Sequence, residues 1–150
     1  MTELVYWDSV CFLAYFQEEA DRVGACQATL ERAEAGDILI VTSTLTLAEC
    51  LWLRNAPPIP KDRADIVRKF FRRSIIRLRN VTRFISEEAQ TLVWDYGIKP
   101  KDAIHVATAI EAKIQTLETF DDGLISKSGK AGSPPLLIRK PLPSSQPRLF

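Results

Sequence analysis

The sequence predicts an α/β fold in which helices cover a parallel sheet. Short runs of β-branched, aliphatic or aromatic residues at 4–7 and 38–41 are typical of buried strands, and Thr116-Leu117-Glu118-Thr119 is a short candidate strand. Segments rich in Ala, Leu, Glu and Arg lie between them and favour helices. The chain has 150 residues, 46% hydrophobic and 26% charged, which matches one globular domain. Alternation of strands with helices implies that the strands run parallel.

In the first half of the chain, each predicted element ends at a recognisable signal. The predicted elements are a strand over 4–7, one or two helices over 9–36, a second strand over 38–41 and a helix over 45–55. Asp8 follows the first strand directly, and Gly36 provides a stop for the helical segment. Three prolines between residues 57 and 60 forbid further helix and predict a loop.

The second half begins with a long predicted helix over 61–79, with Ile66, Phe70, Ile75 and Leu78 available for a core face. The later predictions are a third strand over 80–84, a helix from Ser86 to Gly97, an Ala-rich helix from about Asp102 to Lys113, and strands over 116–119 and 136–138. Five of the nine prolines fall after residue 132. We therefore predict one domain over 1–132 and a Pro-rich tail over 133–150 with an edge strand.

Several classes of protein do not fit the sequence. No stretch reaches the roughly 20 apolar residues of a membrane span, and the acidic start does not match a secretory signal. We therefore expect a soluble, cytoplasmic protein with no membrane partner. The spacing of Cys11, Cys26 and Cys50 indicates neither a disulfide framework nor a zinc site, so we expect buried thiols. Glycine-rich phosphate-binding motifs are absent from the sequence.

The net charge of +1 hides strongly charged regions. Residues 1–50 contain nine acidic and two basic residues, whereas 61–83 contain nine basic and two acidic residues. Residues 84–125 are again acidic, and 126–150 contain five basic residues and no acidic ones. Such asymmetry indicates possible partners among nucleic acids or cations.

Four acidic residues stand where a parallel sheet places its ligands, beyond the carboxyl ends of the strands. Asp8 and Asp121 follow strands, Glu49 lies in the helix after the second strand, and Asp102 opens the Ala-rich helix. Each also has an ordinary structural interpretation: a helix cap for Asp8 or Asp102, a solvent-facing Glu49, and a turn at Asp121. Taken together they predict a carboxylate cluster, which needs a cation or shared protons to persist. Oxygen ligands select Mg²⁺ or Mn²⁺. His105, the only histidine, lies one turn after Asp102 and could face the same cleft, but a lone histidine on a helix is more often packed or capping.

At these residues the chain resembles the PIN-domain ribonuclease family and, within it, the VapC-like toxins of toxin–antitoxin pairs. The matching motifs are Val5-Tyr6-Trp7-Asp8-Ser9, Thr46-Leu47-Ala48-Glu49, Lys101-Asp102-Ala103 with the small residues that follow, and Thr119-Phe120-Asp121. Their order and spacing agree with the family over about residues 3–125. Leu124, where the family often has an aromatic residue, and the tail beyond Ser133 depart from its pattern.

The resemblance implies a parallel-sheet α/β/α sandwich of PIN-domain type and a ribonuclease that uses Mg²⁺ or Mn²⁺. It implies that Asp8, Glu49, Asp102 and Asp121 are catalytic and hold the metal, and that a metal-activated water cleaves RNA to leave a 5′-phosphate and a 3′-hydroxyl. Ser9 and Thr119 would hold these carboxylates by hydrogen bonds, and Asp122 is a weaker candidate beside Asp121. An antitoxin protein and a second copy of the chain are the implied partners.

The basic residues of the predicted long helix have two alternative functions. Phosphate contacts with RNA are one. Contact with an acidic segment of a partner protein is the other. The residues concerned are Arg68, Lys69, Arg72, Arg73 and Arg77.

Two further hypotheses compete with the nuclease. A module of the same fold could bind RNA or protein without catalysis. A phosphohydrolase with Asp8 as nucleophile is disfavoured, because Val10 stands where the Asp-x-Asp pattern needs its second aspartate.

Overall fold

The protein, described here over residues 2–143 by a computed structural model, has one five-stranded sheet in the order β3-β2-β1-β4-β5. Every neighbouring pair of strands is parallel. The elements in chain order are β1 (Glu3–Trp7), α1 (Ser9–Phe16), α2 (Val23–Glu34), β2 (Ile38–Ser43), α3 (Leu45–Glu49), the 3₁₀ turn η1 (Lys61–Arg63), α4 (Ala64–Phe71), β3 (Ile76–Arg79), α5 (Arg83–Tyr96), α6 (Pro100–Glu111), β4 (Thr116–Glu118), α7 (Asp122–Ile125) and β5 (Leu137–Arg139). The predicted α/β/α sandwich is confirmed.

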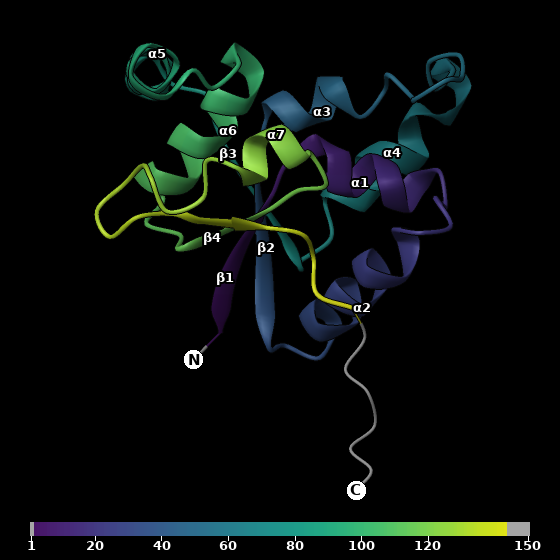
Figure 1. Cartoon of the computed structure of the whole chain (residues 1–150). Coiled ribbons are helices and arrows are strands. Elements are labelled where there is room, and N and C mark those ends of the chain that lie inside the picture. The colour runs from purple at the N-terminus through teal and green to yellow at the C-terminus, as the bar shows by residue number, and fades with distance from the viewer. Residues whose placement is uncertain (1, 144–150) are drawn as a thin grey trace, which may run out of the picture.

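Helices cover both faces of the sheet, as Figure 1 shows. Helices α1, α2 and α4 pack on one face, and α5 and α6 pack on the other. The central strand β1 contributes to both cores, since Val5 and Trp7 belong to the first and Tyr6 to the second. Successive side chains of a strand point to opposite faces, so a strand buried on both sides is apolar throughout.

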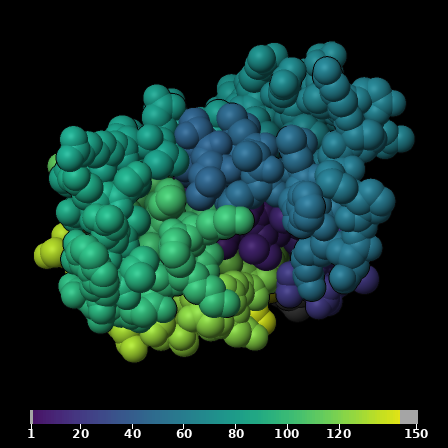
Figure 2. Space-filling model, turned by 90° about the horizontal axis from the view of Figure 1, so that it is seen from above, coloured from purple at the N-terminus to yellow at the C-terminus, as the bar shows by residue number. Residues whose placement is uncertain are grey.

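The carboxyl ends of the parallel strands meet at one edge of the sheet, the upper edge in Figure 1, where α3 and α7 also lie. Figure 2 looks down on this edge. Purple atoms of the N-terminal part of the chain are visible at the bottom of a hollow between the blue segment around α3 and the green segments of α6 and α7. The fold therefore brings the ends of distant segments together here.

Most predicted elements are confirmed. The segment 9–36 forms two helices, and the strands near 4–7, 38–41 and 116–119 are present. Gly97 ends α5 in the left-handed conformation, with φ of 68°. This conformation is accessible to glycine without steric cost.

The predicted long helix over 61–79 is wrong. Helix α4 ends at Phe71, and Ile76–Arg79 forms the edge strand β3. The sequence from Ile76 alternates apolar and basic residues, which suits a strand, and four residues of β3 pair with β2. The expected core residue Ile66 is 67% exposed, and Val67 and Phe71 are buried instead.

The predicted strand over 80–84 is wrong for the same reason, because β3 already occupies that place in the sheet. Helix α5 begins at Arg83 rather than at Ser86. The Thr82 side chain caps it by accepting a hydrogen bond of 3.1 Å from the Ile85 backbone N–H. Helix α3 ends at Glu49, well before residue 55. Trp52, which follows it, is exposed and provides no packing that would extend the helix.

The predicted edge strand near 136–138 is present as β5, which pairs with β4. Leu136 and Ile138 are buried in the core beneath α6. The part of the predicted tail that forms β5, Leu137–Arg139, thus belongs to the sheet. Residues 144–150 of the predicted tail lie outside the described residues. The boundary at residue 132 stays a prediction.

The three cysteines are buried free thiols, as predicted. None of the helices within residues 2–143 has the length and hydropathy needed to cross a bilayer.

Candidate functional site

Asp8 lies at the carboxyl end of β1, where it caps α1. One carboxylate oxygen accepts a hydrogen bond of 3.1 Å from the Val10 N–H, and the other accepts one of 2.6 Å from the Thr119 hydroxyl. The residue is only 1% exposed. Burial raises the pKa of Asp8 to about 6, against the lowering effects of His105 and of the Thr119 hydrogen bond. Asp8 is therefore both fixed in orientation and costly to ionise.

Thr119 also connects Asp8 to Asp121. Its hydroxyl oxygen accepts a hydrogen bond of 3.1 Å from the Asp121 N–H. The Asp121 carboxylate in turn accepts one of 3.1 Å from the Gly123 N–H and so caps α7. The Thr-x-Asp segment is therefore one hydrogen-bonded unit that leads from β4 into α7.

Asp102 lies in the first turn of α6 and shares a pocket of about 310 Å³ with Asp121. Burial is the main cause that raises the pKa of Asp102, and the nearby carboxylates of Asp121 and Glu49 add to it. Lys99 and Lys127 also line this pocket. The pocket thus combines acidic and basic side chains.

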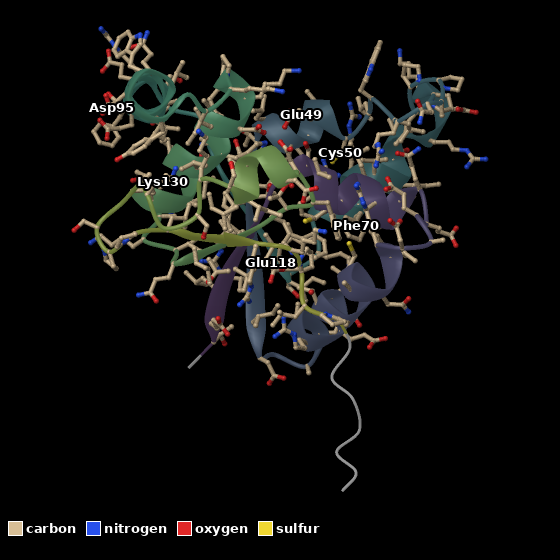
Figure 3. All side chains as sticks on the ribbon, in the orientation of Figure 1. Glu49, Cys50, Phe70, Asp95, Glu118 and Lys130 are labelled. Atoms are coloured by element: carbon tan, nitrogen blue, oxygen red, sulfur yellow. The ribbon has the colours of Figure 1, made fainter. Side chains whose placement is uncertain are left out.

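Glu49, the last residue of α3, forms a hydrogen bond with His105. His105 Nε2 lies 2.8 Å from Glu49 Oε1, and His105 Nδ1 lies 2.7 Å from the Tyr6 hydroxyl. Burial raises the pKa of Tyr6 far above its usual range, so the phenol keeps its proton. Figure 3 labels Glu49 above the sheet at α3.

The four predicted carboxylates therefore meet at one edge of the sheet. The charge of Asp102 raises the pKa of Asp8, and the charges of Asp121 and Glu49 raise the pKa of Asp102. Within residues 2–143, no three His, Cys, Asp or Glu side chains are arranged closely enough to hold a metal ion together. Their donor atoms are all carboxylate oxygens, and their mutual repulsion is of the kind that a divalent cation relieves, so the residues fit Mg²⁺ or Mn²⁺.

Ser9 and Asp122 differ in their surroundings. Ser9 is buried at the start of α1, and its backbone carbonyl lies 3.8 Å from Cys50 Sγ. The Asp122 side chain is 90% exposed, and its carboxylate lies 3.9 Å from Lys140 Nζ. Asp122 therefore points into solvent.

The basic residues expected on one long helix lie on two elements and the turn between them. Arg68 and Lys69 are exposed on α4, and Arg72 is exposed where that helix ends. Arg73 forms an ion pair of 2.6 Å with Glu34, and Arg77 is exposed on β3. None of the five lines the pocket that contains Asp102 and Asp121.

Sequence reasoning missed three residues of the site: Tyr6, Lys99 and Lys127. The spacing of His105 three residues after Asp102, on the same side of a helix, did indicate a place near the site, although a packed or capping role was favoured. Nothing local in the sequence indicates that His105 pairs with Glu49, because these residues are 56 positions apart.

A larger apolar groove of about 840 Å³ lies between α1, the proline loop and α4. Its apolar lining includes Tyr15, Phe16, Ile59, Ile66 and Phe70. The basic residues Arg63, Lys69 and Arg73 line it as well. The groove therefore combines an apolar floor with positive charge.

Residues 5–130 match the PIN domain. The chain belongs to the PIN domain family, as its motifs predicted. No curated protein matches the sequence.

Solved structures with a similar fold include three from toxin–antitoxin systems. VapC20 from Mycobacterium tuberculosis, a sarcin-ricin-loop-cleaving toxin, is 18% identical with a TM-score of 0.65, over 81% of this chain and 93% of that one. A toxin–antitoxin complex from Klebsiella pneumoniae is 18% identical with a TM-score of 0.60, over 93% and 98%. VapBC2 from Rickettsia felis, bound to a DNA fragment of the promoter, is 18% identical with a TM-score of 0.60, over 91% and 97%. These likenesses confirm the fold.

Proposed function

We propose that this protein is a ribonuclease that requires Mg²⁺ or Mn²⁺ and that it is the toxin of a toxin–antitoxin pair. The observation that carries the proposal is the position of Asp8, Glu49, Asp102 and Asp121 at the carboxyl edge of the sheet, where Thr119 links Asp8 to Asp121 and one pocket contains Asp102 and Asp121. Membership of the PIN domain family and the similarity of fold to toxin structures support it.

Asp8 and Asp102 are the best candidates to hold the ion, with Glu49 and Asp121 beside them. When bound, such an ion supplies Lewis acidity, which makes a water a better nucleophile at neutral pH and offsets negative charge on the phosphodiester. Thr119 keeps one oxygen of Asp8 in place and also holds the backbone of Asp121. Ser9 remains a proposed support for Asp8, and Asp122 remains the weaker candidate.

The RNA backbone needs positive charge near the acidic edge, since carboxylates repel phosphates. Lys99 and Lys127 line the same pocket as Asp102 and Asp121. We assign phosphate contacts next to the cleavage site to these two lysines. The five basic residues around α4 and β3 are candidates for more distant RNA contacts or for contacts with a protein.

Cleavage of RNA with Mn²⁺ or Mg²⁺ by the wild type, Asp8→Asn and Asp102→Asn tests the proposed activity. Asp95→Asn is the matched control, because Asp95 is an exposed aspartate on α5 that Figure 3 labels apart from Glu49. We expect both site variants to lose activity and the control to keep it. Undiminished cleavage in both site variants would refute the nuclease. RNA binding that persists in EDTA without any cleavage would favour the non-catalytic binding module.

The apolar groove supports a protein partner. Its apolar floor and its basic residues Arg63 and Lys69 complement an amphipathic segment that carries acidic residues. We propose that this segment belongs to the antitoxin. The basic residues that line the groove would then serve the partner protein rather than RNA.

If a small reading frame lies immediately beside the gene, co-expression with it tests the partner. Ile66 is 67% exposed and lines the groove, so Ile66→Glu is expected to fold, to cleave RNA and to lose the complex. Phe84→Glu is the control, because Phe84 is an exposed apolar residue on α5 outside the groove. An Ile66→Glu variant that still forms the complex would place the partner elsewhere. Cytoplasmic location and homodimerisation stay predictions, and light scattering in solution tests the second.

A further inference from the structure

His105 is fully inside the protein although histidine is a polar residue. It is 1% exposed and makes hydrogen bonds through both ring nitrogens, with Tyr6 on β1 and with Glu49 on α3. Tyr6 and His105 also pack edge to face, with ring centroids 5.7 Å apart. Three separate elements are thus joined through one imidazole.

The donors and acceptors of this chain of hydrogen bonds fall into one consistent order. An unperturbed phenol is protonated at neutral pH, so the Tyr6 O–H donates to His105 Nδ1. The other nitrogen, Nε2, then carries the proton and donates to the Glu49 carboxylate. The bond to Glu49 also exists when the imidazole is doubly protonated, because Nε2 carries a proton in both forms.

Glu49 depends on this bond more than Asp8 or Asp121 depends on any one partner. Asp8 is held through both oxygens, and Asp121 caps a helix through a backbone N–H. Within residues 2–143, the Glu49 side chain has His105 as its hydrogen-bond partner, through Oε1, and Oε2 accepts no hydrogen bond there. A glutamate at the end of a five-residue helix has several rotatable bonds to order.

We infer that His105 is a positioning residue, fixed by Tyr6, that holds Glu49 with one oxygen free toward the other carboxylates and so sets the affinity of the site for a divalent cation. The inference rests on the proposed metal-dependent function. Carboxylates that bind metals are commonly oriented by such outer hydrogen bonds, and loss of the outer partner typically weakens metal binding about 10-fold to 100-fold.

Titration of the whole protein with MnCl₂ by calorimetry tests the inference without any cleavage assay. We expect His105→Leu to weaken Mn²⁺ binding at least about 10-fold. His105→Gln should bind close to the wild type, because its amide N–H can replace the Nε2 donor. Tyr6→Phe should fall between them. Thr29→Val is the matched control, because Thr29 is a buried polar residue of α2, on the opposite face of the sheet from α6, and its hydroxyl donates to the Ala25 carbonyl.

A double-mutant cycle with Glu49→Gln separates positioning from general damage to the fold. If His105 acts through Glu49, His105→Leu has little further effect on Mn²⁺ affinity in the Glu49→Gln background. Equal affinity in the wild type and His105→Leu, or equal losses in His105→Leu and His105→Gln, would overturn the inference and leave the metal site intact. A wild type that binds no Mn²⁺ would overturn the metal site itself and this inference with it. If His105→Leu does not fold, Tyr6→Phe and His105→Gln decide instead. Weaker Mn²⁺ binding by Tyr6→Phe with near-wild-type binding by His105→Gln would support the inference, and equal Mn²⁺ affinity of Tyr6→Phe and the wild type would overturn it.

Discussion

The Thr119 hydroxyl donates a hydrogen bond of 2.6 Å to the buried carboxylate of Asp8, across 111 residues of sequence. This bond joins the ends of β1 and β4, which are neighbours in the sheet. The same hydroxyl accepts from the Asp121 N–H. One small side chain therefore sets the relative position of two of the four acidic residues.

Thr119→Val should destabilise the protein by about 1–3 kcal/mol, the usual cost of leaving a buried polar group without its partner. It should also weaken Mn²⁺ binding, because Asp8 loses one of its two hydrogen bonds. Urea denaturation and calorimetry measure the two effects. Thr116→Val is the control: Thr116 is buried on the same strand, and its hydroxyl makes no hydrogen bond within residues 2–143. Equal effects of the two substitutions would contradict the role of Thr119.

The raised pKa of Asp8 should make the protein less stable as pH rises. Asp8 has a pKa of about 6 in the folded protein against an ordinary value of 3.8, so the folded state binds more protons between these values. The free energy of unfolding of the metal-free protein should therefore fall as pH rises from about 4 to 7, by up to about 3 kcal/mol from this group. Asp102 and Glu118 are shifted in the same direction. Urea denaturation in EDTA measures the slope, and Asp8→Asn should flatten it.

Addition of Mn²⁺ should reverse that loss, because a cation favours the ionised carboxylates. At a concentration 100 times the dissociation constant the gain is about 2.7 kcal/mol. Thermal or urea unfolding at pH 7.5 with and without Mn²⁺ measures it. The gain should vanish in Asp102→Asn and persist in Asp95→Asn. Equal stabilisation of both variants would mean that the ion binds elsewhere.

Lys127→Glu should weaken RNA binding, because this residue lines the pocket beside Asp102 and Asp121. Lys130→Glu is the control, since Lys130 is an exposed lysine nearby in the sequence that does not line that pocket. Fluorescence anisotropy with single-stranded RNA in EDTA measures binding without cleavage. The slope of the logarithm of affinity against the logarithm of salt concentration should become shallower by about 0.7 per lost phosphate contact. The same loss in both variants would indicate a general charge effect.

Arg139→Met should destabilise the protein, because it removes the cation beside the buried carboxylate of Glu118. Arg139 Nη2 lies 3.2 Å from Glu118 Oε2, and the Trp7 indole N–H donates to Oε1 at 2.9 Å. Loss of one partner of a buried ion pair costs about 3–5 kcal/mol, and the lower end applies here because Arg139 is partly exposed. Adding Glu118→Gln to Arg139→Met should recover part of the lost free energy of unfolding, because it removes the buried charge that has lost its partner. Lys140→Met, at an exposed neighbour, should have little effect in the same urea titration. A negligible effect of Arg139→Met would show that the Arg139–Glu118 ion pair contributes little to stability.

The sequence by itself determined the class of fold and the identity of the acidic residues. The runs 4–7 and 38–41 are apolar enough to mark buried strands without any other information, because burial on both faces removes polar residues from a strand. Asp8 and Asp121 could be assigned to the carboxyl edge of the sheet because they follow predicted strands closely. Asp102 and Glu49 followed from the order of the motifs.

Only the tertiary structure decided which segments pair with one another. Residues 76–79 alternate apolar and basic residues over only four positions, too few to distinguish a strand from the end of a helix, and pairing with β2 makes them a strand. The basic residues that were predicted on one helix therefore lie on α4, on β3 and on the turn between them. The bond between His105 and Glu49 likewise depends on α6 packing beneath α3, and no local pattern encodes it. Local periodicity reports the local backbone and its buried face, whereas contacts between distant residues arise only when the whole chain packs.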